Sequence, residues 1–194
     1  PQSEHCQRLP IPPPADHGTA DEPLPVMVWI HGGSYVSGAG DLPLYDPRAL
    51  VLQERVIVVT VTYRLGVLGY VGDGVGRPAN LGLLDQLAAF RWVQANIASF
   101  GGDPARVTAF GQSAGADAVL HLMTVDGAAS LFSRAIVQSA PLRTIRGRAG
   151  IGAAMNVALD ETLVDGDGLD LEVAQAAVAR AARKSPVALM AFGP

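Results

Sequence analysis

The chain has 194 residues, which is about the size of one domain, and its 49% hydrophobic and 16% charged residues are typical of a globular protein. The formal net charge of −4 gives no support to a surface that binds nucleic acid. No apolar run approaches the roughly 18 residues that a membrane span needs.

Residues 10–25 hold six prolines and are expected to form a surface loop with polyproline character. Beyond them, apolar β-branched runs alternate with runs whose hydrophobic residues recur at i, i+3 and i+4. The apolar runs predict strands at residues 26–30, 56–63, 106–110 and 134–139. The periodic runs predict helices at residues 81–99 and 171–183. Further helices are expected at residues 47–55, where Pro47 follows Asp46, and at residues 113–123, beginning at or just after Ser113. The glycine-rich residues 66–80 are expected to form an irregular loop. This order predicts an α/β fold with a largely parallel sheet.

Residues 108–119 read TAFGQSAGADAV and place Ser113 in a Gly-x-Ser-x-Gly motif between a predicted strand and a predicted helix. The chain must reverse sharply there, and Gly111 and Gly115 remove side chains that would collide. The serine oxygen then lies at a helix N-terminus, where N–H groups and the helix dipole favour negative charge. The motif predicts a nucleophilic serine with the N–H of Ala114 as an oxyanion donor. The alternative is a small residue in an ordinary turn.

A second motif, WIHGGSYVSG at residues 29–38, follows the first predicted strand. It is similar to the Gly-Gly loop that supplies the other donors of an oxyanion hole. Gly32 and Gly33 alone are compatible with an ordinary loop turn. Together with Ser113 they favour a site in which several backbone donors stabilise one developing oxyanion.

Together with several further segments, these two motifs resemble the type-B carboxylesterases, the cholinesterase-like branch of the α/β hydrolases. The resemblance is nearly continuous from residue 3 to about residue 141 and keeps the order of the family's segments. The matching segments are SEHC (3–6), LPVMVWIHGGSYVSG (24–38), VTYRLGVLGY (61–70), ANLGLLDQLAAFRWVQANIASFGGDPARVTAFGQSAGA (79–116) and FSRAIVQSA (132–140). It implies an α/β-hydrolase fold, with a mostly parallel central sheet and helices on both faces.

The resemblance also implies serine-dependent hydrolysis of carboxylic esters through an acyl-enzyme, with Ser113 as the nucleophile. The oxyanion donors would be the backbone N–H groups of Gly33, Ser34 and Ala114. Ser34 replaces a family glycine, which is tolerable because the donor is backbone. The residues expected to support the site are Gly32, Gly111, Gln112, Gly115 and Ser139.

Three of the resembling positions carry further expectations. Ser139 would help to orient the catalytic acid or would be an ordinary strand-end serine bonded to backbone. Gln112 stands where many members have Glu, and the missing charge weakens the case for a cationic, choline-type substrate. His31 is expected to make a structural hydrogen bond, and Arg64 and Asp85 are expected to be structural polar residues.

In the family a Glu or Asp and then a His, both far downstream, complete the catalytic triad. The only histidine after Ser113 is His121, which on a helix lies about 12 Å along the axis from Ser113 and cannot contact its hydroxyl. His5 and His17 match no base position, and the acids Asp160, Glu161, Asp165 and Glu172 lack the family's motif. We therefore expect the base and the acid to lie outside these residues.

The chain is thus expected to be the central part of a longer esterase and an incomplete α/β-hydrolase domain. Residues 1–25 would form an N-terminal loop, residues 26–141 the core with both motifs, and residues 142–194 a mainly helical tail. Its strands would be inner strands of the complete sheet, with unpaired edges and apolar faces exposed. Cys6 is the only cysteine and cannot form an internal disulfide.

Two alternatives remain open at this stage: a catalytically inactive binding or adhesion module, and an esterase like hormone-sensitive lipase. No cofactor and no metal are expected. The expected partner is a small-molecule carboxylic ester, with no nucleic acid and no membrane span. Residues 1–10 carry no targeting segment, and both a cytoplasmic and a secreted location fit. Oligomeric state and ester specificity are left open.

Overall fold

The computed structural model describes residues 6–12, 22–73, 76–142, 148–163, 170–183 and 192–194. The described strands form one four-stranded sheet in the order β2-β1-β3-β4, and every neighbouring pair is parallel. These strands are β1 (Leu24–Ile30), β2 (Ile57–Val61), β3 (Gly102–Gln112) and β4 (Arg134–Gln138). The predicted parallel α/β sheet is confirmed, with β1 and β3 inside it and β2 and β4 at its edges.

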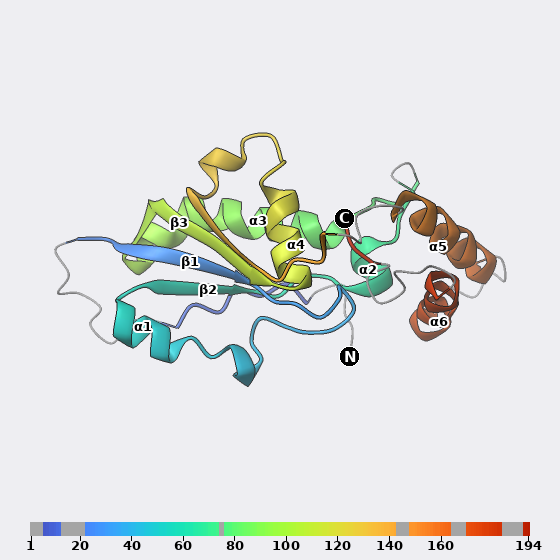
Figure 1. Ribbon diagram of the computed structural model, residues 1–194, viewed down its shortest axis with the longest axis horizontal. Coiled ribbons are helices and arrows are strands. Elements are labelled where there is room, and N and C mark those ends of the chain that lie inside the picture. The colour runs from blue at the N-terminus through green and yellow to red at the C-terminus, as the bar shows by residue number, and fades with distance from the viewer. Residues whose placement is uncertain (1–5, 13–21, 74–75, 143–147, 164–169, 184–191) are drawn as a thin grey trace.

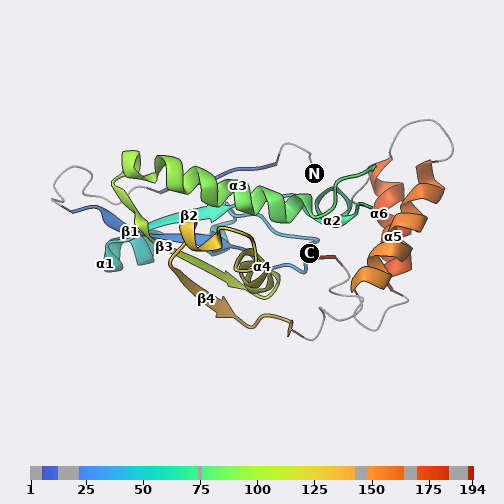
Figure 2. The same ribbon diagram turned by 90° about the horizontal axis from the view of Figure 1, so that it is seen from above.

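Helices flank the sheet, as Figures 1 and 2 show. The described helices are α1 (Arg48–Glu54), α2 (Gly66–Tyr70), α3 (Leu81–Asn96), α4 (Ala114–Leu122), α5 (Arg148–Leu163) and α6 (Leu171–Ala182). Short 3-10 helices occur at η1 (Pro43–Tyr45), η2 (Ile97–Phe100) and η3 (Ala128–Ser130). None of the described helices combines the length and the apolar composition that crossing a membrane would require.

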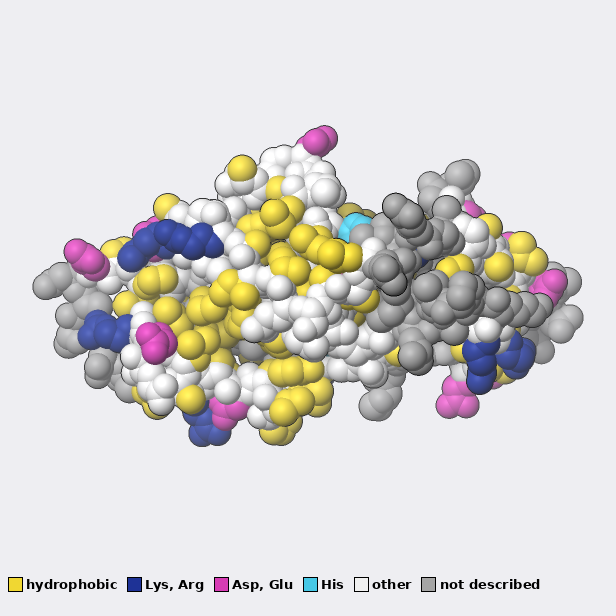
Figure 3. Space-filling model, viewed as in Figure 1, with side chains coloured by type: hydrophobic (Ala, Val, Ile, Leu, Met, Phe, Trp, Pro, Cys, Tyr) yellow, Lys and Arg dark blue, Asp and Glu magenta, His cyan; other side chains and the backbone are white. Residues whose placement is uncertain are grey.

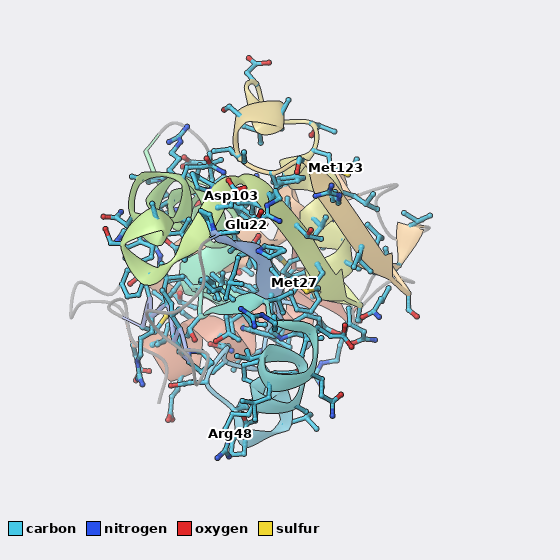
Figure 4. All side chains as sticks on the ribbon, turned by 90° about the vertical axis from the view of Figure 1, so that its left-hand side faces the viewer. Glu22, Met27, Arg48, Asp103 and Met123 are labelled. Carbon is cyan, nitrogen blue, oxygen red and sulfur yellow. The ribbon has the colours of Figure 1, made fainter. Side chains whose placement is uncertain are left out.

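The core is divided by the alternation of side chains along β2. Val58 packs with Val51 of α1 in one apolar cluster, while Val59 packs with Phe90 and Val93 of α3 in the other. Because successive residues of a strand point to opposite faces, α1 covers one face of the sheet and α3 the other. Figure 4, viewed from the end of the molecule where Glu22 and Asp103 lie, shows Met27 of β1 above α1, whose residue Arg48 is also labelled.

The N-terminal segment lies along the edge strand β2. Thr62 N–H donates to the Arg8 carbonyl at 3.0 Å, and Thr60 N–H donates to the Pro10 carbonyl at 3.1 Å. Proline lacks an N–H, but its carbonyl still accepts, so a proline-rich segment can satisfy one side of an edge strand. Part of the expected surface loop therefore pairs with the sheet.

Two predictions about the elements are wrong: the start of one strand and the first part of one loop. The strand predicted at 106–110 begins at Gly102, because Gly101 turns the chain with φ +79 at the end of η2 and Gly102 pairs at once with Leu24. The first part of the loop predicted at 66–80 is the helix α2. Glycine lowers helix propensity by about 1 kcal/mol, but α2 buries Val67 and Tyr70 in the core, and this burial outweighs the loss.

The segment after β4 is largely helical in its described parts, and α6 packs on α5 and on α2. Figure 2 shows α5 and α6 together at the end of the molecule away from α1. At the opposite edge of the sheet from β2, all residues of β4 are exposed, and Ile136 and Val137 keep 42% and 38% of their surface. Figure 3 shows hydrophobic side chains gathered on this face. The exposed apolar edge expected from the sequence is present at β4.

Candidate active site

Ser113 lies in the turn between β3 and α4, at the carboxyl end of the sheet (Figure 1). Its backbone has φ +56 and ψ −120, a conformation that non-glycine residues rarely adopt. Two hydrogen bonds hold it: its N–H donates to the Gln138 carbonyl at 2.9 Å, and its carbonyl accepts from the Asp117 N–H at 3.0 Å. The sharp, strained turn predicted from the motif is confirmed, and the helix begins at Ala114 as expected.

The two glycines of the motif are required by close backbone contacts. A Cβ at Gly111 would lie 2.6 Å from the Gly115 carbonyl oxygen, and a Cβ at Gly115 would lie 2.8 Å from the His31 carbonyl oxygen. Real Cβ atoms do not approach backbone this closely. A side chain at either position would therefore collide with backbone, as the sequence predicted, and its absence lets α4 sit directly on the end of β1.

The loop after β1 meets the serine turn. A Cβ built on Gly32 would lie 3.2 Å from the Cβ of Ser113 and 2.8 Å from the Gln112 carbonyl oxygen. The sheet brings them together, because β1 and β3 are parallel neighbours with Ile30 opposite Gly111. Two motifs that are about 80 residues apart in the chain thus form one site, as parallel strands place their carboxyl ends at one edge.

The predicted oxyanion donors lie in this joined region. The loop turns tightly through Gly33, whose carbonyl accepts the N–H groups of Val36 at 3.0 Å and Ser37 at 3.1 Å. Within the part of the chain that the structure describes, no hydrogen bond uses the N–H of Gly33, Ser34 or Ala114 as donor. Ala114 opens α4, and the first N–H groups of a helix have no partner inside it. These amides can therefore serve an external oxygen.

His31 is a structural residue beneath the loop. It is fully buried, its Nδ1 donates to the Gly32 carbonyl at 2.7 Å, and its ring stacks on Tyr63 at 4.4 Å. The Tyr63 hydroxyl in turn donates to the His31 carbonyl at 2.8 Å. Burial lowers the pKa of His31, so the imidazole is neutral at pH 7. The structural hydrogen bond expected for His31 is confirmed.

Arg64 and Asp85, which were expected to be structural polar residues, form an ion pair with each other. The guanidinium donates to both carboxylate oxygens, at 2.8 Å to Oδ2 and 2.6 Å to Oδ1, and the Arg64 backbone N–H adds a bond of 3.0 Å. Such two-point geometry holds the loop after β2 to α3.

Gln112 and Ser139 border the serine turn. Gln112 is exposed and places an uncharged amide beside Ser113. Ser139 follows β4, is exposed and has φ +55. Its neighbour Gln138 accepts the Ser113 N–H, so the end of β4 borders the site. The orienting role of Ser139 stays a prediction.

The histidines and acids that were not expected to serve as the catalytic base or acid make other contacts or lie outside the described residues. His121, near the far end of α4, has its Nε2 3.5 Å from Arg148 Nη1 and 3.9 Å from Asp117 Oδ2. Asp160 pairs with Arg77 at 2.6 Å. The residues His5, His17 and Asp165 lie outside the described residues.

Sequence reasoning missed Asp117. It is fully buried in α4, one turn after Ser113, and accepts a hydrogen bond of 2.7 Å from the hydroxyl of Tyr35, which belongs to the predicted oxyanion loop after β1. A signal was available, because a lone carboxylate in the otherwise apolar stretch SAGADAVL must find a buried partner.

With this geometry established, comparison with known proteins decides the family. The model of the Carboxylesterase family matches residues 1–148. The chain belongs to the carboxylesterase family. A solved structure titled thermophilic PNB esterase superimposes on the whole chain with a TM-score of 0.81 and 37% identity, and the chain covers 41% of it. The fold of this carboxylesterase-family chain is therefore that of the α/β hydrolases.

Curated relatives agree with this assignment. The Probable N-octanoylanthranilate hydrolase AqdA2 of Rhodococcus erythropolis is 50% identical over 141 residues, which is 73% of this chain and 31% of that protein. The para-nitrobenzyl esterase of Bacillus subtilis is 48% identical over 147 residues, 74% of this chain and 29% of that protein. The chain thus spans about a third or less of the length of these relatives.

Proposed function

We propose that this chain carries the nucleophile and the oxyanion hole of a serine carboxylesterase. The observation that carries the proposal is the contact between the Gly32 loop and Ser113, which brings free backbone amides beside a serine held in a strained turn. Relatives named as esterases and hydrolases support it and disfavour an inactive binding module.

In this mechanism Ser113 Oγ attacks the ester carbonyl carbon, and the carbonyl oxygen becomes an oxyanion. The N–H groups of Gly33, Ser34 and Ala114 donate to that oxygen, and each such donor lowers the barrier by about 3 kcal/mol. Expulsion of the alcohol leaves an acyl group on Ser113. Water then attacks the acyl carbon, and the second oxyanion collapses to free acid and Ser113.

Each attack also requires a base that takes the proton of Ser113 or of water and returns it to the leaving group. Within the described residues, His31 is committed to Gly32 and His121 to the Arg148 and Asp117 cluster. The base and its acid partner are therefore proposed to come from other residues of the protein. The neutral Gln112 beside Ser113 favours an uncharged ester over a cationic one.

The proposal is tested in the intact protein by Ser113→Ala, with Ser99→Ala, an exposed serine on η2, as the matched control. Hydrolysis of p-nitrophenyl acetate and butyrate should fall by about a thousandfold or more in the first variant and not in the second. A fluorophosphonate probe should label the peptide that contains Ser113. Unchanged hydrolysis in Ser113→Ala would show that Ser113 is not the nucleophile.

A further inference from the structure

The oxyanion loop is built from consecutive residues with unfavourable backbone angles. Gly33 has φ +112, Ser34 has φ +55 and Tyr35 has φ +62. Non-glycine residues persist in this region only where their surroundings hold them there. The direction of the Ser34 N–H, one of the three proposed donors, therefore depends on whatever fixes Tyr35.

Tyr35 is held through its side chain and its backbone. It is fully buried, its hydroxyl donates to Asp117 Oδ2 at 2.7 Å, and its ring packs against Tyr70 at 4.6 Å. Its carbonyl accepts the Gly66 N–H at 2.7 Å. Burial raises the pKa of Tyr35, so the hydroxyl keeps its proton and stays a donor.

Asp117 connects this anchor to the nucleophile. It lies on α4 one turn after Ser113 and donates its N–H to the Ser113 carbonyl. Arg148 Nη2 donates to the same oxygen, Oδ2, at 2.9 Å, and the guanidinium lies 5.9 Å from the centre of the Tyr35 ring. A fully buried carboxylate is tolerated only when it is paired and hydrogen-bonded in this way.

We propose that Tyr35 and Asp117 are positioning residues that lock the oxyanion loop to the nucleophile helix, with Arg148 as the counter-charge. This role rests on the proposed esterase function. The Tyr35–Asp117 hydrogen bond fixes the loop that carries the Ser34 N–H, so that this N–H can donate to the oxyanion that forms when Ser113 attacks. Loosening it leaves ester binding intact and weakens only the interaction with the oxyanion.

The test compares four variants of the intact protein. Tyr35→Phe removes only the donor, and Asp117→Ala removes the acceptor. Asp117→Asn keeps a neutral acceptor of the same shape, and Tyr70→Phe is the matched control. The Tyr70 hydroxyl is buried and, among the described residues, has no hydrogen-bond partner. The control therefore loses a buried hydroxyl without losing a bond.

We expect Tyr35→Phe and Asp117→Ala to lower kcat for p-nitrophenyl butyrate by about 10- to 100-fold, with KM changed by less than about 2-fold. The affinity for a trifluoromethyl ketone, which forms a tetrahedral oxyanion on the serine, should fall in parallel. Tyr70→Phe should keep most of the activity, and Asp117→Asn should lose less kcat than Asp117→Ala, because its amide oxygen still accepts the Tyr35 hydroxyl. The double variant Tyr35→Phe/Asp117→Ala should be no slower than the slower single variant, because both remove one interaction.

A second measurement does not depend on ester hydrolysis. Amide hydrogen exchange over residues 32–38 should be faster in Tyr35→Phe than in the wild type and in Tyr70→Phe. Unchanged exchange and unchanged kcat in a folded Tyr35→Phe protein would overturn the positioning role, as would a loss of kcat equal to that of Tyr70→Phe. Failure of the esterase function would appear instead as activity that survives Ser113→Ala, while the exchange result would still judge the Tyr35–Asp117 contact.

Discussion

The two ends of the parallel sheet hold their polar groups in different ways. At the amino end, Arg106 pairs with Asp103 at 2.7 Å, and their side chains keep 40% and 25% of their surface exposed. At the carboxyl end, Asp117 is fully buried between Tyr35 and Arg148. Water screens an exposed pair, so it contributes little, whereas a buried carboxylate depends on its partners. Removing a polar group should therefore matter far more at one end than at the other.

The backbone shows the same asymmetry. Ser34, Tyr35, Ser113 and Ser139, all at the carboxyl end, have positive φ without being glycine. Arg55 and Asn80 also have positive φ, but they flank helices: Arg55 is the left-handed residue that commonly ends a helix, and Asn80 directly precedes α3. Four of the six non-glycine residues with positive φ among the described residues thus lie where the site is proposed, which is typical of functional sites.

The largest effect should come from removing the buried carboxylate. Asp117→Ala removes the acceptor shared by the Tyr35 hydroxyl and Arg148 Nη2 and should lower the free energy of unfolding by about 3–5 kcal/mol. Asp103→Ala, at the amino end, should have a much smaller effect. Urea denaturation of both variants measures the difference. Equal losses would remove the contrast between the two ends.

A smaller effect should follow from crowding the contact between α4 and β1. Gly115→Ala places a Cβ against the Ile30 and His31 backbone and should destabilise the protein by about 1–3 kcal/mol, while also displacing Ser113. Gly150→Ala in α5 meets nothing within 4 Å and should stabilise the protein by about 0.5–1 kcal/mol through helix propensity. Thermal unfolding of the two variants measures both the expected loss and the expected gain of stability. A Gly115→Ala variant with unchanged stability would mean that α4 and β1 can move apart without cost.

The smallest effect should be a difference between the two ends in the pH range over which a titrating group changes the free energy of unfolding. Burial lowers the pKa of His31, so below about pH 6.5 the unfolded state binds more protons than the folded state. The contribution of His31 to the free energy of unfolding should be fully present above about pH 6.5. It should be lost as the pH drops from there towards the folded pKa of His31. Pairing with Arg106 lowers the pKa of Asp103, so its contribution is present above about pH 4 and is lost only below it.

Urea denaturation between about pH 7.5 and about pH 5.5 isolates the histidine contribution. His31→Gln, which does not titrate, should show a flatter dependence than the wild type. His121, whose pKa burial also lowers, accounts for part of the remaining slope, and His121→Gln should flatten it further. An unchanged slope in both variants would mean that neither histidine is linked to folding in this range.

Much of the fold could be predicted because its strands have a strong local signal. The β-branched run at residues 56–63 and the periodic run at residues 81–99 correspond to β2 and α3 within a few residues. α2 could not be predicted in this way, because its glycines lower local propensity and only burial of Val67 and Tyr70 in the assembled core stabilises it. The start of β3 was missed for a similar reason, since Gly102 pairs with Leu24 across the sheet.

The sequence by itself determined the identity of the proposed nucleophile and the need for glycine around it, because a sharp strand-to-helix turn has a local composition. It also determined the two loops that should meet. Only the tertiary structure decided how they meet: the parallel pairing of β1 with β3 sets Gly32 against Ser113. The bond between Tyr35 and Asp117 joins residues 82 positions apart, and a contact of that kind exists only after the sheet has aligned its strands.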